Sequence, residues 1–416
     1  MIETGGRRSV PQSSLLHTYL AGFRGPSGEA VEAGEVAVPQ RVRQYTGEFW
    51  TARQRQASSL HEVSYRACFK PQLPGFFIEM LTQEGDIVYD PFSGRGTTAI
   101  EAGLRGRRVI ANDANPLSRI LTEPRFTPPT AAEVAERLDT IPRGGDQADL
   151  DLSMFYHPGT EREIVALRRY LLGRREDGTA DAVDRWIAMV ATNRLTGHSG
   201  GFFSVYTLPP NQAVSPRSQE RINRKRGQVP EYRDTHRLIL RKTKSLITGL
   251  TPEEITNIHR AGTGALFLTG DARKTPAIAT GSVRLTVTSP PFLDIVQYRE
   301  DNWLRCWFCG LDSEAVGRTI TMARSVAEWE NVMGDVFREL FRVTAPGGYV
   351  AFEVGEVRKK TVRLEEHVVP LGIAAGFLCE GILINRQVFS KTSHIWGVGN
   401  NRSGTNTNRI VVFSKP

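Results

Sequence analysis

The stretch DIVYDPFSGRGTTAIEAGLRGRRVIAND, residues 86–113, constrains the fold of this chain more than any other. The apolar run 86–90 predicts a strand, and the glycine-rich turn after it leads into a helix. Gly106 marks the end of that helix, and 107–113 predicts a second strand. Strands joined by so short a helical connection pair in parallel through a right-handed crossover. The chain is therefore expected to contain a parallel α/β sheet.

The same alternation of strands and helices returns near the C-terminus. Capping-box patterns at 98–101 and 130–133 and a cap at Ser325 predict helix starts. ALFLTGD, VRLTVTS and YVAFEVG (265–271, 283–289 and 349–355) have the continuous apolar character of buried parallel strands. The last strands are expected over 377–388 and 409–413.

These patterns divide the chain into four parts. Residues 1–40, rich in Gly, Ser and Pro, are expected to be a loosely ordered arm. Residues 41–130 would form the first half of a sheet domain and 265–416 its second half. Residues 131–264 would be a helical and basic insert between the two halves.

Composition narrows the class of protein. Of the 416 residues, 40% are hydrophobic and 24% charged, as in ordinary globular proteins, and no run approaches the roughly 18 apolar residues of a membrane span. Four cysteines and the absence of an apolar signal core predict a reducing, cytoplasmic location. The C-x-x-C at 306–309 has no second ligand pair, so we expect a helical core stripe and no metal site.

The loop after the first strand, DPFSGRGTT (90–98), predicts a ligand site. Gly94 and Gly96 allow a sharp turn and a close backbone approach, and the following helix presents free N–H groups. Asp113 ends the next strand at about the offset at which an acidic residue binds ribose hydroxyls. The third glycine of a dinucleotide fingerprint is missing and no G-K-[ST] follows, which disfavours NAD, FAD and a phosphate-gripping loop.

With its Asp-Pro-Phe prefix, this arrangement resembles the S-adenosylmethionine site of class I methyltransferases. The resemblance implies a Rossmann-like, mostly parallel seven-stranded sheet flanked by helices, with S-adenosyl-L-methionine as cofactor. It also implies that Asp113 holds the ribose, that Asp271 after the third strand contacts the adenine, and that Lys70 lies near the methionine end. The residues implied in cofactor binding are Lys70, Asp90, Phe92, Gly94, Gly96, Thr97, Asp113 and Asp271.

The motif TSPPF (288–292) follows the fourth strand, at the same edge of the sheet. It resembles the catalytic motif of amino-methylating DNA methyltransferases, whose Ser-Pro-Pro form is associated with cytosine N4 and whose Asp or Asn form is associated with adenine N6. Ser289 Oγ and the Pro290 carbonyl would accept hydrogen bonds from the target amine, Pro291 would stiffen the turn, and Phe292 would stack on a flipped base. In many Ser-Pro-Pro enzymes this motif precedes the glycine loop, whereas here it follows.

The positions of the cysteines disfavour methylation at cytosine C5, and several other substrates stay open. Methylation at cytosine C5 uses a Pro-Cys nucleophile, and none of the four cysteines follows a proline. The first choice is therefore a site-specific cytosine-N4 DNA methyltransferase that acts by base flipping and direct displacement. Adenine N6, a base amine of RNA such as tRNA, and a catalytically silent nucleic-acid binder are the alternatives. A companion restriction endonuclease is compatible with the sequence.

The insert is expected to recognise the nucleic acid. Between 217 and 244 stand ten basic and three acidic residues, against a net charge of +8 for the whole chain. Such a strip can neutralise phosphates. Asn193, His198 and Tyr206 in the preceding loop are further candidates. The residues predicted to bind nucleic acid are Arg194, Arg217, Arg221, Arg224, Lys225 and Arg226.

Overall fold

The computed structural model describes residues 15–386 and 407–416, apart from 27, 39, 52–56, 67, 209–212, 292–297, 321–322, 324 and 358–361. None of the helices in these ranges is long and apolar enough to cross a membrane.

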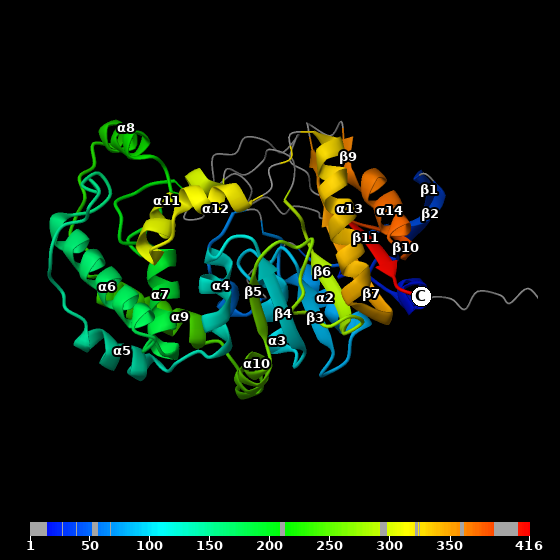
Figure 1. The fold of residues 1–416 in the computed structure, drawn as a ribbon, viewed down its shortest axis with the longest axis horizontal. Helices are drawn as coiled ribbons and strands as arrows, with labels where there is room; N and C mark the ends of the chain where they lie inside the picture. The colour runs from blue at the N-terminus through cyan, green and yellow to red at the C-terminus, as the bar shows by residue number, and fades with distance from the viewer. Residues whose placement is uncertain are drawn as a thin grey trace, which may run out of the picture.

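A nine-stranded mixed sheet forms the centre of the molecule, in the order β1-β2-β10-β11-β7-β6-β3-β4-β5 (Figure 1). The pairs β1/β2, β10/β11 and β7/β11 are antiparallel and the others are parallel. A short hairpin, β8/β9, stands apart. The strands are β1 (Glu32–Val38), β2 (Gln40–Gly47), β3 (Ile87–Asp90), β4 (Arg108–Asp113), β5 (Leu266–Thr269), β6 (Val283–Thr288), β7 (Thr344–Val354), β8 (Glu356–Val357), β9 (Val362–Arg363), β10 (Leu378–Arg386) and β11 (Thr407–Ser414).

The helices either cover the two faces of this sheet or, for most of the insert, gather beyond its β5 edge (Figure 1). They are α1 (Leu15–Gly22), α2 (Gln72–Leu81), α3 (Thr97–Leu104), α4 (Leu117–Thr122), α5 (Ala131–Thr140), α6 (Pro158–Glu176), α7 (Ala182–Arg194), α8 (Pro216–Arg226), α9 (Thr235–Ile247), α10 (Pro252–Thr263), α11 (Tyr298–Cys309), α12 (Ser313–Thr319), α13 (Val326–Val343) and α14 (Leu364–Ala374). Successive strand residues pack on opposite faces: Val88 joins the core under α2 and α3, whereas Tyr89 joins the core under α13 and α14.

The predicted α/β class is confirmed, but the sheet is mixed and has nine strands, whereas a mostly parallel sheet of seven strands was expected. The run β10-β11-β7-β6-β3-β4-β5 supplies seven strands, and β2 and β1 extend the sheet beyond them. Residues 1–40 were expected to be a loose arm. In the structure, residues 15–22 of this segment are helical, residues 32–38 form β1, and β2 begins at Gln40. β5 is an edge strand with Leu266 38% exposed, so the expectation that it is buried is also wrong.

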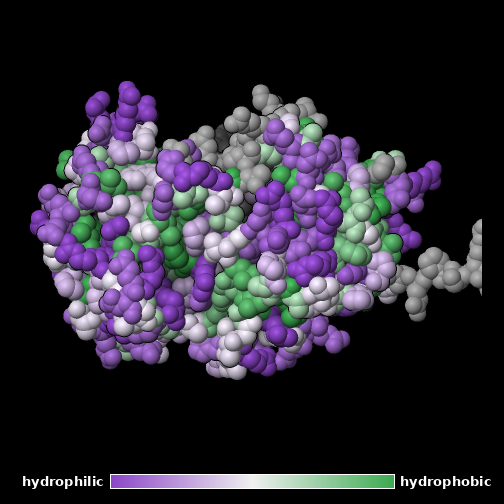
Figure 2. Space-filling view, in the orientation of Figure 1, coloured by the Kyte–Doolittle hydropathy of each residue, from purple (hydrophilic) through white to green (hydrophobic). Residues whose placement is uncertain are grey.

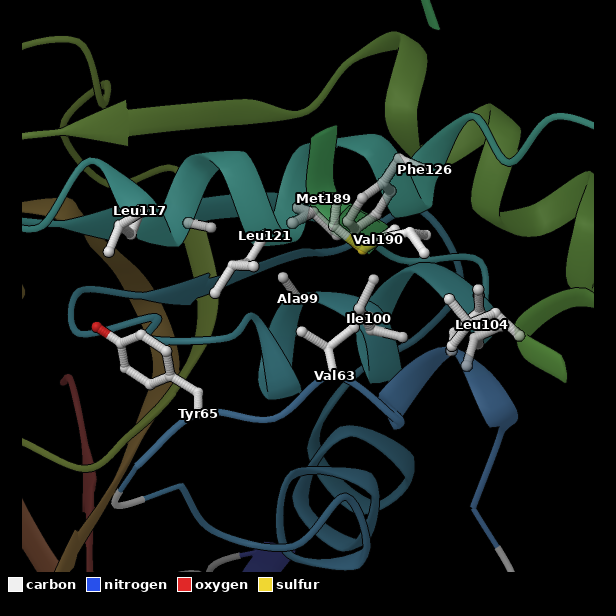
Figure 3. Packing of buried hydrophobic residues seen from close by; sticks show 14 of the residues in the cluster. Val63, Tyr65, Ala99, Ile100, Leu104, Leu117, Leu121, Phe126, Met189 and Val190 are labelled. Atoms are coloured by element: carbon white, nitrogen blue, oxygen red, sulfur yellow. The ribbon is translucent and has the colours of Figure 1, made fainter. Parts of the chain in front are cut away.

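The insert shares its core with the sheet domain. Met189 and Val190 of α7 pack with Leu121, Phe126 and Ile100 in one buried cluster (Figure 3). Such a shared core positions the insert helices against α3 and α4, beside the glycine loop.

The start of α3 differs from its prediction, whereas that of α5 agrees. The N-cap of α3 is Gly96, and no side chain caps the helix, so the capping box expected at 98–101 is absent. Glu101 instead pairs with His61. The box between Thr130 and Glu133 is present. Glu101 therefore makes a tertiary contact with His61 and does not form the local capping box.

Candidate active site

The glycine loop turns between β3 and α3 through two residues with positive φ. Gly94 has φ 53° and Gly96 has φ 77°, a region that side chains with a Cβ rarely occupy. A Cβ on Gly96 would also lie 2.4 Å from Thr122 Cγ2. The second glycine therefore allows both the turn and the close packing of α4 against the loop.

Asp113 holds this loop from the end of β4. Its Oδ2 accepts a hydrogen bond from the Gly94 N–H at 2.8 Å, and its Oδ1 accepts one from the Asn115 N–H at 2.8 Å. Burial raises the pKa of Asp113 to about 6, against these hydrogen bonds, which lower it. Each carboxylate oxygen has a second lone pair, so Asp113 can still accept a hydroxyl.

Asp90 connects the glycine loop to the strand that carries the second motif. Its Oδ1 accepts hydrogen bonds from the Phe92 N–H at 3.1 Å and from the Thr288 hydroxyl at 2.6 Å. Thr288 is the last residue of β6, directly before Ser289. Asp90 is 1% exposed, and its desolvation raises its pKa to about 7. This carboxyl group fixes the two motifs relative to each other.

A cavity that opens to solvent lies between these motifs. Its space free of protein atoms is about 1340 Å³, and this volume includes open solvent at its mouth. Its walls come from the segment before α2, the two loops, the end of β5, and α12 and α13. Of the predicted site residues it is lined by Phe92, Gly94, Thr97, Asp113, Asp271, Ser289, Pro290 and Pro291. Two motifs that lie almost two hundred residues apart in the sequence therefore share one cavity.

Three predicted cofactor residues are not part of this lining: Lys70, Asp90 and Gly96. Asp90 and Gly96 shape the loop from behind. Asp271 does line the cavity, but its carboxylate is held by the Arg273 guanidinium at 2.6 Å. That hydrogen bond lowers the pKa of Asp271, which stays half-exposed.

The Ser-Pro-Pro turn is held on both sides. The Ser289 hydroxyl donates to the buried carboxylate of Glu353 on β7, which also accepts from Asn408 Nδ2 at 3.1 Å. The indole N–H of Trp329, in the first turn of α13, donates to the Pro291 carbonyl at 3.0 Å. Desolvation raises the pKa of Glu353. Phe292 lies outside the described residues.

Sequence reasoning missed Glu353 and Trp329. A carboxylate within the apolar run YVAFEVG is a detectable signal, because a charge in a buried strand is costly unless it has partners. Trp329 carries no comparable signal, since an aromatic residue in an amphipathic helix usually packs in a core.

The predicted nucleic-acid residues fall into two groups. Arg194 is largely buried, its guanidinium 4.1 Å from the centre of the Phe202 ring, and burial lowers its pKa to about 10. Asn193 is also engaged internally, through the backbone of Ser64. By contrast, the basic residues of α8 are exposed.

The expected C-x-x-C core stripe is confirmed. Cys306 and Cys309 end α11 and are buried, and the described residues contain no cluster of His, Cys, Asp or Glu that could hold a metal ion.

Comparison with known proteins supports the resemblance drawn from the motifs. Residues 27–118, which include the glycine loop and Asp113, match the model of a DNA methylase family. Over this stretch the chain is similar to DNA methylases. The type II methyltransferase M.MvaI of Kocuria varians is 29% identical over 119 residues, which are 28% of this chain and 25% of that protein. The match thus spans a quarter of the relative's length.

Solved structures also match, with low superposition scores. A protein named as a DNA modification methylase from Thermus thermophilus is 25% identical, covering 35% of this chain and 51% of that one, with a TM-score of 0.21. An S-adenosylmethionine-dependent methyltransferase from Methanosarcina mazei is 11% identical, covering 82% and 96%, with a TM-score of 0.31. The fold of this chain is therefore described by its own strand order.

Proposed function

We propose that this protein is a DNA methyltransferase that transfers a methyl group from S-adenosyl-L-methionine to the N4 amine of cytosine. The observation that carries the proposal is the shared cavity, which is lined at once by the glycine loop and by Ser289, Pro290 and Pro291. Adenine N6 is the second choice of base, because the two reactions use the same acceptor geometry.

The residues of the cavity fit the proposed cofactor. Gly94 carries no side chain between its backbone and the cavity, Asp113 keeps acceptor capacity for ribose hydroxyls, and Phe92, Val332 and Met333 offer an apolar wall for a flat adenine. S-adenosyl-L-methionine, when bound, supplies an electrophilic methyl group on a sulfonium.

The protein's own contribution is to make the target amine a better nucleophile. The lone pair of an exocyclic amine is delocalised into its ring. Because the Ser289 hydroxyl donates its hydrogen bond to Glu353, its oxygen keeps both lone pairs to accept from the amine N–H. Trp329 fixes the turn from the other side, so the acceptors do not have to reorganise during the reaction.

Glu353 also suits the balance of protons. The amine nitrogen gains a methyl group and must lose one proton. A carboxylate whose pKa is raised by burial is a stronger base than a solvated one. We assign Glu353 as a positioning residue that acts on the amine through Ser289: the Ser289 oxygen accepts the proton that the amine loses while the Ser289 hydroxyl proton passes to Glu353.

The choice of DNA as the polymer rests on the family match, and RNA is the competing substrate. To test the reaction, the protein is incubated with methyl-labelled S-adenosylmethionine and unmodified duplex DNA, with bulk tRNA in parallel. Nucleosides are then separated before mass detection, since N4- and C5-methylcytosine have equal masses. Label in N4-methylcytosine is expected, and N6-methyladenine would correct the base alone.

Ser289→Ala is the matched control. It should abolish transfer while S-adenosylhomocysteine still binds, because no loop hydrogen bond to Asp113 or Asp90 involves the Ser289 side chain. Full activity of this variant would contradict the assigned role. Cofactor binding without transfer to any polymer, in the wild-type protein, would favour a silent nucleic-acid binder.

A further inference from the structure

Helix α8 carries four basic side chains on its outer face. Arg217, Arg221, Arg224 and Lys225 stand at positions i, i+4, i+7 and i+8, which lie on one side of an α-helix, and all four are exposed. Figure 2 shows the hydrophilic side chains of this helix projecting from the upper left of the molecule.

The opposite face of α8 is fixed by amide side chains. Gln219 Nε2 donates to the Tyr206 carbonyl at 3.0 Å, and Asn223 Nδ2 donates to the Met154 carbonyl at 2.7 Å. Just beyond the helix, Gln228 Nε2 also donates to Tyr206 O at 2.8 Å. Gln219 is the buried residue of α8, so this helix has no apolar stripe. Specific hydrogen bonds, rather than hydrophobic burial, therefore set its position.

Glu220, the acidic residue of α8, is exposed among these cations, but its single negative charge leaves the outer face with a net positive charge. None of the ion pairs among the described residues includes a side chain of α8, and Arg221 donates only to the hydroxyl of Ser218, at 3.0 Å. Cations in a last turn can serve the helix dipole, which accounts for Arg224 and Lys225. Arg217 and Arg221 lie outside that turn, and like charges four residues apart destabilise a helix. The stripe is therefore suited to an anionic partner.

The position of α8 connects it to the cavity. β7 runs towards the upper edge of the molecule in Figure 1, and the N-terminus of α13 lies at that edge. α8 rises on the same side, beyond α11 and α12 (Figure 1). A long polyanion whose base enters the cavity can therefore also pass over α8.

We propose that α8 binds the phosphate backbone of a DNA duplex held over the cavity. This rests on the proposed function for the identity of the polymer. Backbone contact is favoured over base reading because Gln219 and Asn223, the amides suited to adenine, are turned inward. The outer face offers three guanidinium groups and one ammonium group, and a guanidinium can bind a phosphate through two parallel N–H groups.

The test measures binding to mixed-sequence duplex DNA across a range of salt concentrations, with S-adenosylhomocysteine present and no methyl transfer required. Each phosphate contact contributes about 0.9 to the slope of log affinity against log salt. Replacing all four cations with Ala should therefore lower that slope by about 3 to 4. Replacing the three arginines with Lys should leave the slope unchanged, because the charges remain.

Arg108→Ala serves as the surface control. Arg108 is exposed at the amino end of β4, the edge of the sheet opposite the cavity, and its loss should not change the slope. The melting temperature and S-adenosylhomocysteine affinity of each variant show whether it is folded.

An unchanged slope in the all-Ala variant would overturn the proposal. A Lys variant that keeps the slope but loses preference for particular sequences would also overturn it, in favour of base reading. Absence of duplex binding by the wild-type protein would remove both this proposal and DNA as substrate, while label transferred to RNA would leave the methyl-transfer chemistry intact.

Discussion

Glu353→Gln separates the positioning of Ser289 from the stability of the fold. The substitution keeps the shape of the side chain and replaces one carboxylate oxygen with an NH₂ group. Asn408 Nδ2, a donor at 3.1 Å, requires the remaining oxygen. The new NH₂ group then faces Ser289 and donates to its oxygen. A lone pair that the target amine would use is thereby occupied.

The size of the effect on kcat follows from the loss of the hydrogen bond that Ser289 donates to the charged Glu353 carboxylate. A hydrogen bond to a charged group contributes about 1.5–3 kcal/mol. If it acts in the transition state, kcat should fall by about 10- to 150-fold, at about 1.4 kcal/mol for each factor of ten. Cofactor affinity should not change, because Glu353 is not part of the cavity lining.

Stability should move in the opposite direction. Burial raises the pKa of Glu353 in the folded protein, so its charged form destabilises the fold at neutral pH, and this cost disappears as pH falls below the unfolded-state pKa. Gln carries no such cost. We expect the melting temperature of Glu353→Gln at neutral pH to equal or exceed that of the wild type.

The assay is single-turnover methyl transfer as a function of pH, together with thermal unfolding. Wild-type activity should fall as pH falls through the raised pKa of Glu353, and this limb should be absent from Glu353→Gln. The control is Glu339→Gln, because Arg342 lowers the pKa of Glu339 to about 2 and its charge therefore stabilises the fold. That variant should lose stability and keep kcat. Unchanged kcat in Glu353→Gln, or a loss of kcat that follows a loss of stability, would refute the reasoning.

Three further substitutions test the architecture of the cavity. Asp113→Asn places an NH₂ against a backbone N–H, so S-adenosylhomocysteine should bind about 5- to 150-fold more weakly by calorimetry; equal affinity would contradict the role of Asp113. Asp90→Asn keeps an oxygen that can accept both hydrogen bonds now made to Oδ1. Because the pKa of Asp90 is raised to about 7, the stability of the wild type should decline more steeply than that of the variant as pH rises towards 7. Parallel pH profiles of stability from denaturant unfolding would exclude this. Gly96→Ala should destabilise the protein by at least about 1–2 kcal/mol from its positive φ, and adding Thr122→Ala should recover only the part due to the 2.4 Å contact; full recovery would show that φ contributes nothing.

The sequence determined the local chemistry of this protein. The unit from residue 86 to 113 specified a parallel crossover, and its glycines marked the loop, because only glycine adopts positive φ without strain. The edge at which parallel strands end could be assigned from the strand pattern, so the two motifs were correctly expected at one site.

Sequence patterns failed where distant partners compete with local ones. The box expected at Thr98 is absent, because α3 begins earlier, at the N-cap Gly96, and Glu101 contacts His61. The residues predicted to bind nucleic acid include both an inward Arg194 and the outward cations of α8. Hydrophobic periodicity and composition do not distinguish a buried arginine from an exposed one, because the burial of a polar group depends on which residues pack against it.

The sequence by itself therefore determined which residue types are available at the edge of the sheet. The tertiary structure alone decided which of them are joined: Thr288 to Asp90, and Ser289 to Glu353. The physical reason is that a hydrogen bond needs its partners within a few ångströms, and only the order and register of the strands bring such distant residues that close.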